Sequence, residues 1–185
     1  DGSWIGANFD GFGFEAALAR AGLRLEGRRV LLAGCGGAGR PIAERIVAAG
    51  AAALTIIDLD PARAAAFAER LRPLAAGCMV TVGQADRASH EILVNATPLG
   101  MRPDDVPPFS PALVQASGAV VDIVVSDQPS RLERDARRFG KKFVSGIAMV
   151  EGQAELLRAF LLGRAERETD LTDGTFAAPS PGSGR

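Results

Sequence analysis

A glycine turn that follows a short apolar run constrains the fold of this chain more than any other feature. The apolar run covers residues 29–33, glycines follow at positions 34, 36, 37 and 39, and residues 38–49 have the apolar spacing of a helix. A second apolar run, residues 53–58, ends in an acid, Asp58. Strand, G-x-G-x-x-G, helix, strand and acid is the order found in a dinucleotide-binding unit. We therefore expect a bound dinucleotide here and not a merely structural glycine turn.

The residues of this turn each have a physical reason to be small. Gly34 permits the tight turn, Gly36 lets the backbone approach a pyrophosphate, and Gly39 lets the helix pack close to the strand. The free N–H groups at the start of the helix would face the phosphates. Cys35 is expected to be a small filler, not a nucleophile, although the helix start would lower the pKa of its thiol. The predicted phosphate-binding residues are Gly34, Cys35, Gly36, Gly37 and Ala38.

The end of the second apolar run bears on which dinucleotide is bound. A carboxylate at Asp58 accepts hydrogen bonds from the adenosine ribose hydroxyls and repels a 2′-phosphate. Leu59, the next residue, offers no cation. These two cofactor-binding candidates predict NAD in preference to NADP. A third candidate, Arg63, leaves the alternative open, because its guanidinium either meets a phosphate or lies on a solvated helix face.

Strand and helix patterns alternate along the chain. Short apolar runs predict strands, and stretches with 3.6-residue apolar spacing predict helices. The strands are expected at 29–33, 53–58, 79–82, 92–95, 119–125 and 142–144, and the helices at 11–21, 38–49, 60–71, 110–115, 131–139 and 146–162. This alternation predicts an α/β fold, a Rossmann-type, doubly wound parallel sheet of about six strands with flanking helices.

The same pattern suggests how the chain is divided. Residues 1–22 are interpreted as a hinge segment with a linking helix, and residues 23–163 as one NAD(P)-binding Rossmann domain that ends in a long helix. Residues 164–185 are polar and end in a stretch rich in Pro, Ser and Gly, so we expect a disordered tail there.

Composition excludes several classes of function. The net charge is −1 with both signs interspersed, so neither a nucleic-acid partner nor a membrane partner is expected. Two cysteines fit reduced thiols in a cytoplasmic protein, without a disulfide or a metal site. Because the chain has no tyrosine, the Tyr-Lys proton relay of short-chain dehydrogenases is impossible. We expect a small-molecule substrate and, as a further hypothesis, a homodimer.

Few side chains remain for acid–base chemistry. His90 is the single histidine and precedes the fourth strand, at the edge of the sheet opposite the ligand crevice, so a surface or loop position is expected. Lys141 and Lys142 enter the sixth strand at that same edge and are expected to be solvated. None of the three is predicted to carry the reacting proton.

Four short motifs occur in one order over residues 6–163. They are Asn8-Phe9-Asp10-Gly11, Gly34 to Arg40, Asn95 to Met101 (N-A-T-P-L-G-M), and Gly146 to Gln153. They resemble N-T-D-G, G-A-G-G-A-x-R, N-A-T-P-L-G-M and G-x-x-M-L-x-x-Q of the shikimate/quinate dehydrogenase family. That family has an N-terminal substrate domain and a Rossmann cofactor domain, and this chain matches only the second domain and the hinge. The resemblance implies reversible hydride transfer between C4 of NAD(P) and a ring secondary alcohol of the 3-dehydroshikimate/shikimate class.

The resemblance also implies roles for single residues. Asp10 would be one half of a catalytic Lys–Asp pair that binds the substrate, with the Lys in the N-terminal domain that is absent from this chain. Gln153 would contact a substrate hydroxyl. The implied cofactor-binding residues at the nicotinamide end are Asn95, Thr97, Ile123, Gly146 and Met149. The residues alone leave other roles open: a helix N-cap for Asp10, turn chemistry for Asn95 and Thr97, and a core position for Met149.

Three departures from the family pattern leave the substrate open. Val125 stands where the family often has a tyrosine, Phe9 replaces a threonine, and residues 126–130 differ from N-P-x-x-T. The alternatives are therefore another Rossmann alcohol dehydrogenase with a non-shikimate substrate, or a non-catalytic nucleotide-binding module.

Overall fold

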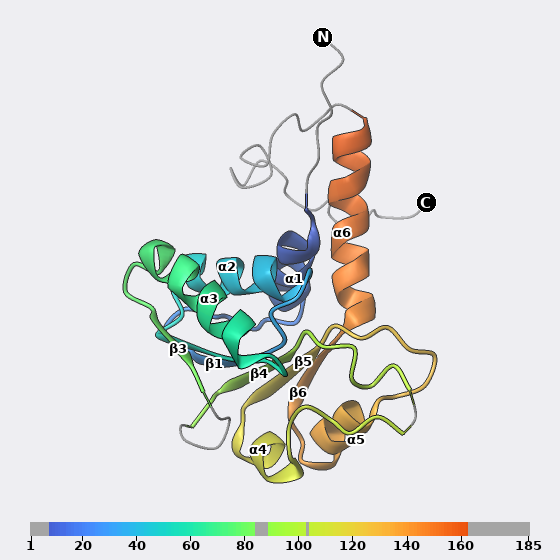
Figure 1. Ribbon diagram of the computed structural model, residues 1–185. Coiled ribbons are helices and arrows are strands. Elements are labelled where there is room, and N and C mark those ends of the chain that lie inside the picture. The colour runs from blue at the N-terminus through green and yellow to red at the C-terminus, as the bar shows by residue number, and fades with distance from the viewer. Residues whose placement is uncertain (1–7, 84–88, 103, 163–185) are drawn as a thin grey trace.

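The computed structural model describes residues 8–83, 89–102 and 104–162. Within these residues, six strands form one parallel sheet in the order β3-β2-β1-β4-β5-β6 (Figure 1). The strands are β1 (Arg29–Ala33), β2 (Ala53–Ile57), β3 (Met79–Val82), β4 (Ile92–Asn95), β5 (Ala119–Asp122) and β6 (Lys142–Ser145). The helices are α1 (Asp10–Arg20), α2 (Gly39–Ala48), α3 (Pro61–Leu71), the 3-10 helix η1 (Arg72–Leu74), α4 (Pro111–Ala116), α5 (Arg131–Arg138) and α6 (Gly146–Leu161).

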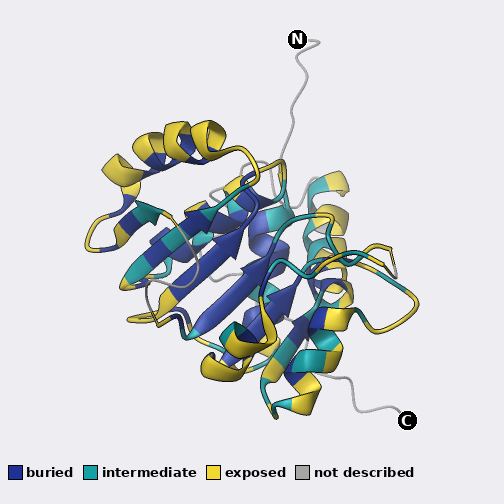
Figure 2. Ribbon diagram, turned by 60° about the horizontal axis from the view of Figure 1, so that its bottom comes forward, coloured by how far each residue is buried: buried dark blue, intermediate teal, exposed yellow. Residues whose placement is uncertain are grey.

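The central strands are buried on both faces, which is why their sequences are apolar without alternation. In β1, Val30 and Leu32 join the core on one face of the sheet, and Leu31 and Ala33 join the core on the other. Successive side chains of a strand point to opposite faces, so each apolar residue fills a core. Figure 2 shows this buried sheet between helices that are exposed on their outer sides.

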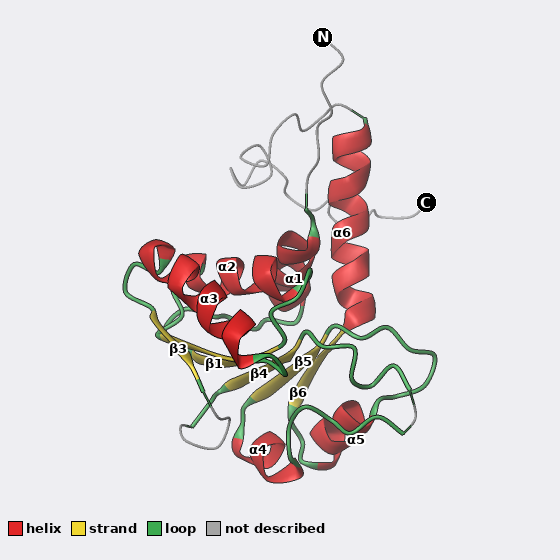
Figure 3. Cartoon of the chain, viewed as in Figure 1, coloured by secondary structure: helices red, strands yellow, loops and turns green. Residues whose placement is uncertain are grey.

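Helices cover both faces of the sheet. Helices α1, α2 and α3 lie over one face, and α4 and α5 lie over the other (Figures 1 and 3). The long helix α6 packs against α1 on the first side. Phe14, Ile42 and Phe67 belong to the core on that side, whereas Val114 and Leu132 belong to the core beneath α4 and α5.

Most helices begin at a residue whose side chain caps the free N–H groups of the first turn. Asp60 caps α3 and accepts hydrogen bonds from two backbone N–H groups of that turn. The start of α1 is different, because Phe9 is its N-cap residue and makes no side-chain cap. The Asn8 side chain accepts a hydrogen bond from the Asp10 backbone N–H at 2.8 Å instead. The N-cap role left open for Asp10 is therefore wrong, and its carboxylate is used elsewhere.

The predicted fold class is confirmed, and the element boundaries differ by a few residues. The strand predicted over 119–125 ends at Asp122, where the carboxylate accepts a hydrogen bond from the Val124 backbone N–H at 3.2 Å. The predicted tail, residues 164–185, and residues 1–7 of the predicted hinge lie outside the described residues. Among the residues that the structure does describe, no helix is both long and apolar enough to cross a membrane.

The strand order places a ligand crevice at a defined edge. Strands β2 and β3 follow β1 on one side, and β4, β5 and β6 follow on the other, so the winding reverses between β1 and β4. In such sheets, ligands bind beyond the carboxyl ends of the strands at this reversal. The strand registers bring five residues level at that edge: Ala33, Ile57, Asn95, Asp122 and Ser145.

Candidate functional site

The glycine loop leaves the carboxyl end of β1 and enters α2. Gly34 has φ +92°, and a Cβ there would lie 2.7 Å from the Ala96 carbonyl oxygen, so the turn requires glycine. A Cβ on Gly39 would overlap the Gly34 carbonyl, which is why α2 can pack directly on the loop. Gly36 and Gly37 are exposed, and a Cβ on either would meet no group within 4 Å. This open backbone in front of a helix start fits a pyrophosphate.

The Asp58 carboxylate is engaged inside the protein. Its Oδ2 accepts hydrogen bonds from the backbone N–H of Cys35 at 2.8 Å and from the Cys35 thiol at 3.2 Å. Its Oδ1 accepts from the Asp60 backbone N–H at 2.9 Å and from the Arg63 guanidinium at 2.5 Å. The side chain is only 3% exposed. Asp58 thus ties the end of β2 to the glycine loop and is not presented to a ribose as predicted.

The protonation equilibria of this cluster follow from the same contacts. Burial alone would raise the pKa of Asp58, but the backbone N–H groups of Asp60 and Cys35 and the Arg63 guanidinium bind the ionised carboxylate and hold its pKa well below the usual range. Burial, together with the hydrogen bond to Asp58 and its charge, raises the pKa of the Cys35 thiol. The predicted lowering of that pKa by the helix start is therefore wrong. The fully buried thiol does have the predicted filler role.

Two guanidinium groups stand beside the glycine loop. Arg63 pairs with Asp58 and keeps 45% of its side chain exposed. Arg40 is also exposed, and its Nε donates to the Cys35 carbonyl oxygen at 3.0 Å. Leu59 is 92% exposed and brings no polar group to this end of the crevice. Arg40 was not among the predicted site residues, although it is the last residue of the glycine motif.

Asn95 and Thr97 shape the loop that follows β4. Asn95 is fully buried, and its Nδ2 donates to the Leu99 carbonyl oxygen and to Asp122 Oδ1, both at 2.9 Å. Its Oδ1 accepts from the Thr97 backbone N–H at 3.0 Å and from the Thr97 hydroxyl at 2.6 Å. These contacts give both side chains the turn role that the residues left open. Contact of this loop with a cofactor stays a prediction.

The segments after β5 and β6 meet at the same edge. Gly146, the first residue of α6, is buried, and a Cβ there would overlap the Ile123 carbonyl. The helix therefore begins directly against the end of β5, with Ile123 half-buried beside it. The other predicted residue of α6, Met149, is 6% exposed and belongs to the core. Its side chain has the core position that its spacing also allowed.

Asp10 and Gln153 are brought together from opposite ends of the chain. Gln153 Nε2 donates to Asp10 Oδ1 at 2.7 Å across 143 residues of sequence. A Cβ on Gly13 would overlap the Gln153 side chain, so this glycine lets α1 and α6 approach closely enough for the contact. The pair borders an open hollow of about 310 Å³ that Asn8, Phe9 and Leu157 also line. The two residues predicted to bind substrate therefore form one polar unit.

Of the two positions expected for His90, the loop is confirmed and the surface is wrong. Its side chain is buried, with 5% exposed, and its Nε2 lies 3.1 Å from the Thr55 hydroxyl oxygen. Burial and the nearby charge of Arg29 lower the pKa of the imidazole. The ring lies at the start of β4, at the edge opposite the glycine loop, so it has no part in the site. Lys142 is exposed at the start of β6, as predicted, and donates to the Ala21 carbonyl oxygen at 2.7 Å.

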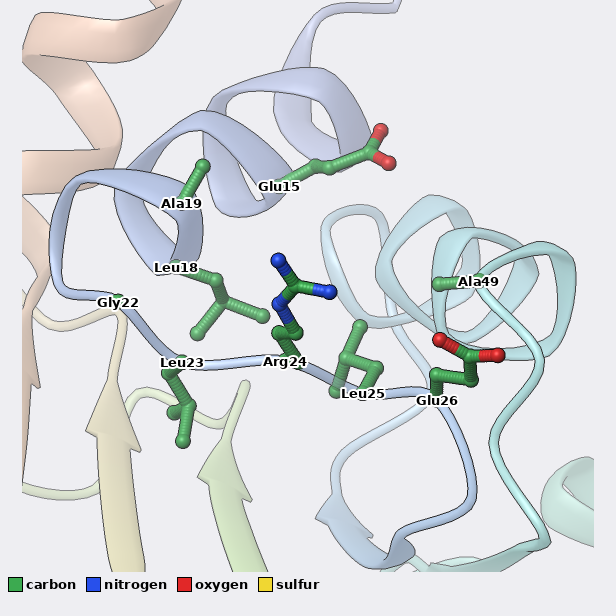
Figure 4. A pocket seen from close by; sticks show the side chains of 9 residues that line it. All are labelled: Glu15, Leu18, Ala19, Gly22, Leu23, Arg24, Leu25, Glu26 and Ala49. Atoms are coloured by element: carbon green, nitrogen blue, oxygen red, sulfur yellow. The ribbon is translucent and has the colours of Figure 1, made fainter.

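A second hollow lies away from these residues. Figure 4 shows it between α1, the connection that leads to β1, and the end of α2. Its volume is about 450 Å³, and the Arg24 side chain lies within it, with Glu15 and Glu26 at its sides. None of the residues predicted for the site lines this hollow.

Comparison with known proteins agrees with the motifs. No protein-family model matches the chain. It is 37% identical over 174 residues to a shikimate dehydrogenase (NADP(+)) of Symbiobacterium thermophilum, a match that covers 88% of this chain and 58% of the relative. The chain spans between 54% and 58% of the length of the first four curated relatives.

Solved structures of dehydrogenases and a reductase are also similar to this chain. The shikimate dehydrogenase of Thermus thermophilus, in complex with NADP(H) and shikimate, has a TM-score of 0.73 and 29% identity and covers 89% of this chain and 60% of its own. The 5-ketofructose reductase of Gluconobacter sp. strain CHM43 has a TM-score of 0.76 and 29% identity over 92% of this chain and 63% of its own. The sheet and its flanking helices define a Rossmann-type α/β protein. The chain is a homologue of proteins named shikimate dehydrogenase (NADP(+)) over the part of their length that it spans, as its four motifs predicted.

The predicted preference for NAD over NADP is contradicted by these relatives. The first four curated relatives are all named shikimate dehydrogenase (NADP(+)). The prediction treated Asp58 as a free carboxylate that repels a 2′-phosphate. In the structure, Arg63 neutralises that carboxylate, and backbone N–H groups occupy it further.

Proposed function

We propose that this chain is the cofactor-binding part of an NADP-dependent oxidoreductase of the shikimate/quinate dehydrogenase type. The observation that carries the proposal is the hydrogen bond between Asp10 and Gln153, 2.7 Å long and 143 residues apart in sequence. A generic nucleotide-binding module has no use for this pair, whereas a polyol substrate needs polar groups to orient its hydroxyls. The homology to shikimate dehydrogenases supports the same reading.

In this proposal, different residues of the chain bind the two ends of the cofactor. The open backbone of Gly36 and Gly37 holds the pyrophosphate, and the exposed part of Arg63, with Arg40 beside it, holds the 2′-phosphate of the adenosine half. The loops after β4 and β5 line the nicotinamide end. When bound, the nicotinamide ring supplies hydride acceptor or donor chemistry.

In this proposal, the Asp10–Gln153 pair binds the substrate. The Gln153 amide holds one carboxylate oxygen of Asp10, which fixes the direction of the other oxygen. A substrate hydroxyl donates to that carboxylate, and orientation of the reacting alcohol is the main contribution of the pair. By resemblance, the proton carrier is a lysine of the substrate domain. Because the chain spans 54–58% of its relatives, turnover is assigned to a protein of the relatives' length.

Calorimetric titration tests the cofactor half on this chain. We expect the 185-residue chain to bind NADP, and Arg63→Ala to weaken NADP binding by about tenfold through loss of a charged phosphate contact. Arg70→Ala, which removes an exposed arginine in the last turn of the same helix as Arg63, is the matched control and should leave NADP binding unchanged. Equal binding of NADP by wild type and Arg63→Ala would contradict the assignment.

Turnover of shikimate or quinate by the full-length gene product tests the substrate half. Asp10→Asn should lower kcat/KM by at least about a hundredfold while leaving NADP binding intact, because the pair does not touch the glycine loop. Glu151→Gln, on the exposed side of the same helix as Gln153, is the control. Full activity of Asp10→Asn would refute the role of the pair.

Two observations support keto-sugars as a second candidate class of substrate. The 5-ketofructose reductase is similar in structure, and Val125, where the family often has tyrosine, is 52% exposed and brings no hydroxyl to the site. A panel of shikimate, quinate and open-chain or ring keto-sugars, assayed with NADPH or NADP, separates the two classes by kcat/KM.

We infer one Rossmann unit over residues 23–163 with α1 as the link, a cytoplasmic location and a homodimer. Exposed apolar side chains along α6, Ile147, Val150, Leu157 and Leu161, support an interface on that helix. Sedimentation of the chain at several concentrations tests the association, and a monomer throughout would contradict it.

A further inference from the structure

Asp122 occupies the centre of the carboxyl edge between β4 and β6. Its register partners are Asn95 on β4 and Ser145 on β6, the residue that caps α6. The side chain is almost wholly buried, with 2% exposed, so it cannot itself contact a ligand in the crevice. An acid in such a place needs partners, because an unpaired buried charge is costly.

The hydrogen-bond partners of Asp122 come from the end of β4 and from the segment that follows β5. Oδ1 accepts hydrogen bonds from Asn95 Nδ2 at 2.9 Å and from the Val124 backbone N–H at 3.2 Å. Oδ2 accepts from the Ser130 hydroxyl at 2.9 Å. Asn95 in turn fixes the segment after β4, through the backbone carbonyl of Leu99. One carboxylate therefore joins residues 95–101, residues 123–130 and the start of α5.

The chain of contacts continues into α5. The Ser130 hydroxyl that donates to Asp122 also accepts from the Glu133 backbone N–H, so the same atom caps this helix. Gly100 lies close as well, since a Cβ there would be 3.9 Å from Asp122 Oδ2. The contacts of this network therefore reach Leu99 and Gly100 inside the first segment and Val124 inside the second, and not only the end residues of the two segments.

We propose that Asp122 is a positioning residue that holds the two segments lining the nicotinamide end, 95–101 and 123–130, in the geometry that binds the nicotinamide half of the cofactor. This inference rests on the proposed function, because the nicotinamide end is defined by it. The adenosine half would bind at the glycine loop and Arg63, on the other side of the β1–β4 reversal. Binding of the adenosine half and binding of the nicotinamide half therefore depend on different residues along the carboxyl edge of the sheet.

The electrostatic setting agrees with this arrangement. Burial raises the pKa of Asp122, while its three hydrogen-bond donors act in the opposite direction and the nearby Glu133 carboxylate adds to the rise. Protonation would remove an acceptor from the network, because a carboxyl oxygen that carries hydrogen becomes a donor. The two segments should then loosen together as the pH falls.

The test compares the affinities of wild type and Asp122→Ala for NADP and for 2′,5′-ADP, which carries only the adenosine half. We expect Asp122→Ala to weaken NADP binding by about tenfold, equivalent to one lost charged hydrogen bond, and to change 2′,5′-ADP binding less than about twofold. Asp104→Asn, a change at an exposed acid of the same region, is the control and should alter neither affinity. A merely structural role would weaken both ligands together.

Two further variants keep the test decisive if Asp122→Ala fails to fold. Ser130→Ala removes one of the partners and should weaken NADP alone, whereas Ser130→Thr keeps a hydroxyl and should restore its affinity. Unchanged NADP binding in Asp122→Ala and Ser130→Ala, or equal loss of NADP and 2′,5′-ADP, would overturn the proposal. Failure of the wild-type chain to bind either ligand would instead refute the proposed function on which it rests.

Discussion

Removal of the Asp58 carboxylate should destabilise the fold as well as alter cofactor binding. Asp58→Ala deletes the acceptor of four hydrogen bonds, two from Cys35, one from the Asp60 backbone and one from Arg63. Among these donors, the Cys35 backbone N–H is buried and would lose its partner, whereas Asp60 and Arg63 are exposed and can turn to water.

The magnitude follows from this difference in exposure. A buried donor that is left unsatisfied costs about 1–3 kcal/mol, whereas an exposed one costs close to nothing. We therefore expect a loss of about 2 kcal/mol in the free energy of unfolding. For a domain of this size that corresponds to a fall in Tm of roughly 4–8 °C.

Thermal unfolding of Asp58→Ala and Asp58→Asn measures this loss, with Asp104→Ala as the exposed control. Because the pKa of Asp58 is lowered in the folded state, its stabilising contribution is fully present above the unfolded pKa of about 4. The contribution is lost as the pH falls through the folded pKa, so the variants and wild type should converge below about pH 4. A Tm of Asp58→Ala equal to wild type at about pH 7 would refute the internal role and restore Asp58 as a ribose acceptor.

Three further outcomes can be measured on this chain. Gly13→Ala should lower Tm, because overlap with Gln153 costs about 1–3 kcal/mol and outweighs the gain in helix propensity of about 1 kcal/mol; Gly83→Ala, where a Cβ meets no group within 4 Å, is the control. The pKa of His90 is lowered by folding, so its stabilising contribution is complete above the unfolded pKa of about 6.5 and is lost as the pH falls through the folded pKa; between about pH 7.5 and pH 5.5, wild type should lose more Tm than His90→Gln. Cys35, buried and with a raised pKa, should react with a thiol reagent at about pH 7.5 only after unfolding in urea, and rapid labelling of the native chain would contradict its burial.

Local sequence determined most of the fold. Apolar runs such as β1 are buried on both faces, and Gly34 makes a turn that other residues cannot make. Both the strand and the turn can therefore be predicted from the local sequence, without knowledge of the segments that pack against them. The helix that follows Asp60 was predicted over residues 60–71 from its local apolar spacing, and the contacts that cap it lie within three residues of Asp60. The resemblance to known motifs also singled out Asp10 and Gln153, although nothing local joins them.

Only the tertiary structure decided what several side chains do. Asp58 looked like a free acceptor at the end of a strand, and the packing of β2 beside the glycine loop turned it into an internal one. His90 became buried because the start of β4 brings it against Thr55 of β2, which no local pattern reveals. The hydrogen bond between Asp122 and Asn95 forms only because β4 and β5 pair in register, with the two residues opposite each other. Sequence shows which groups are present, but hydrogen bonds between distant segments decide which of them still face the ligand.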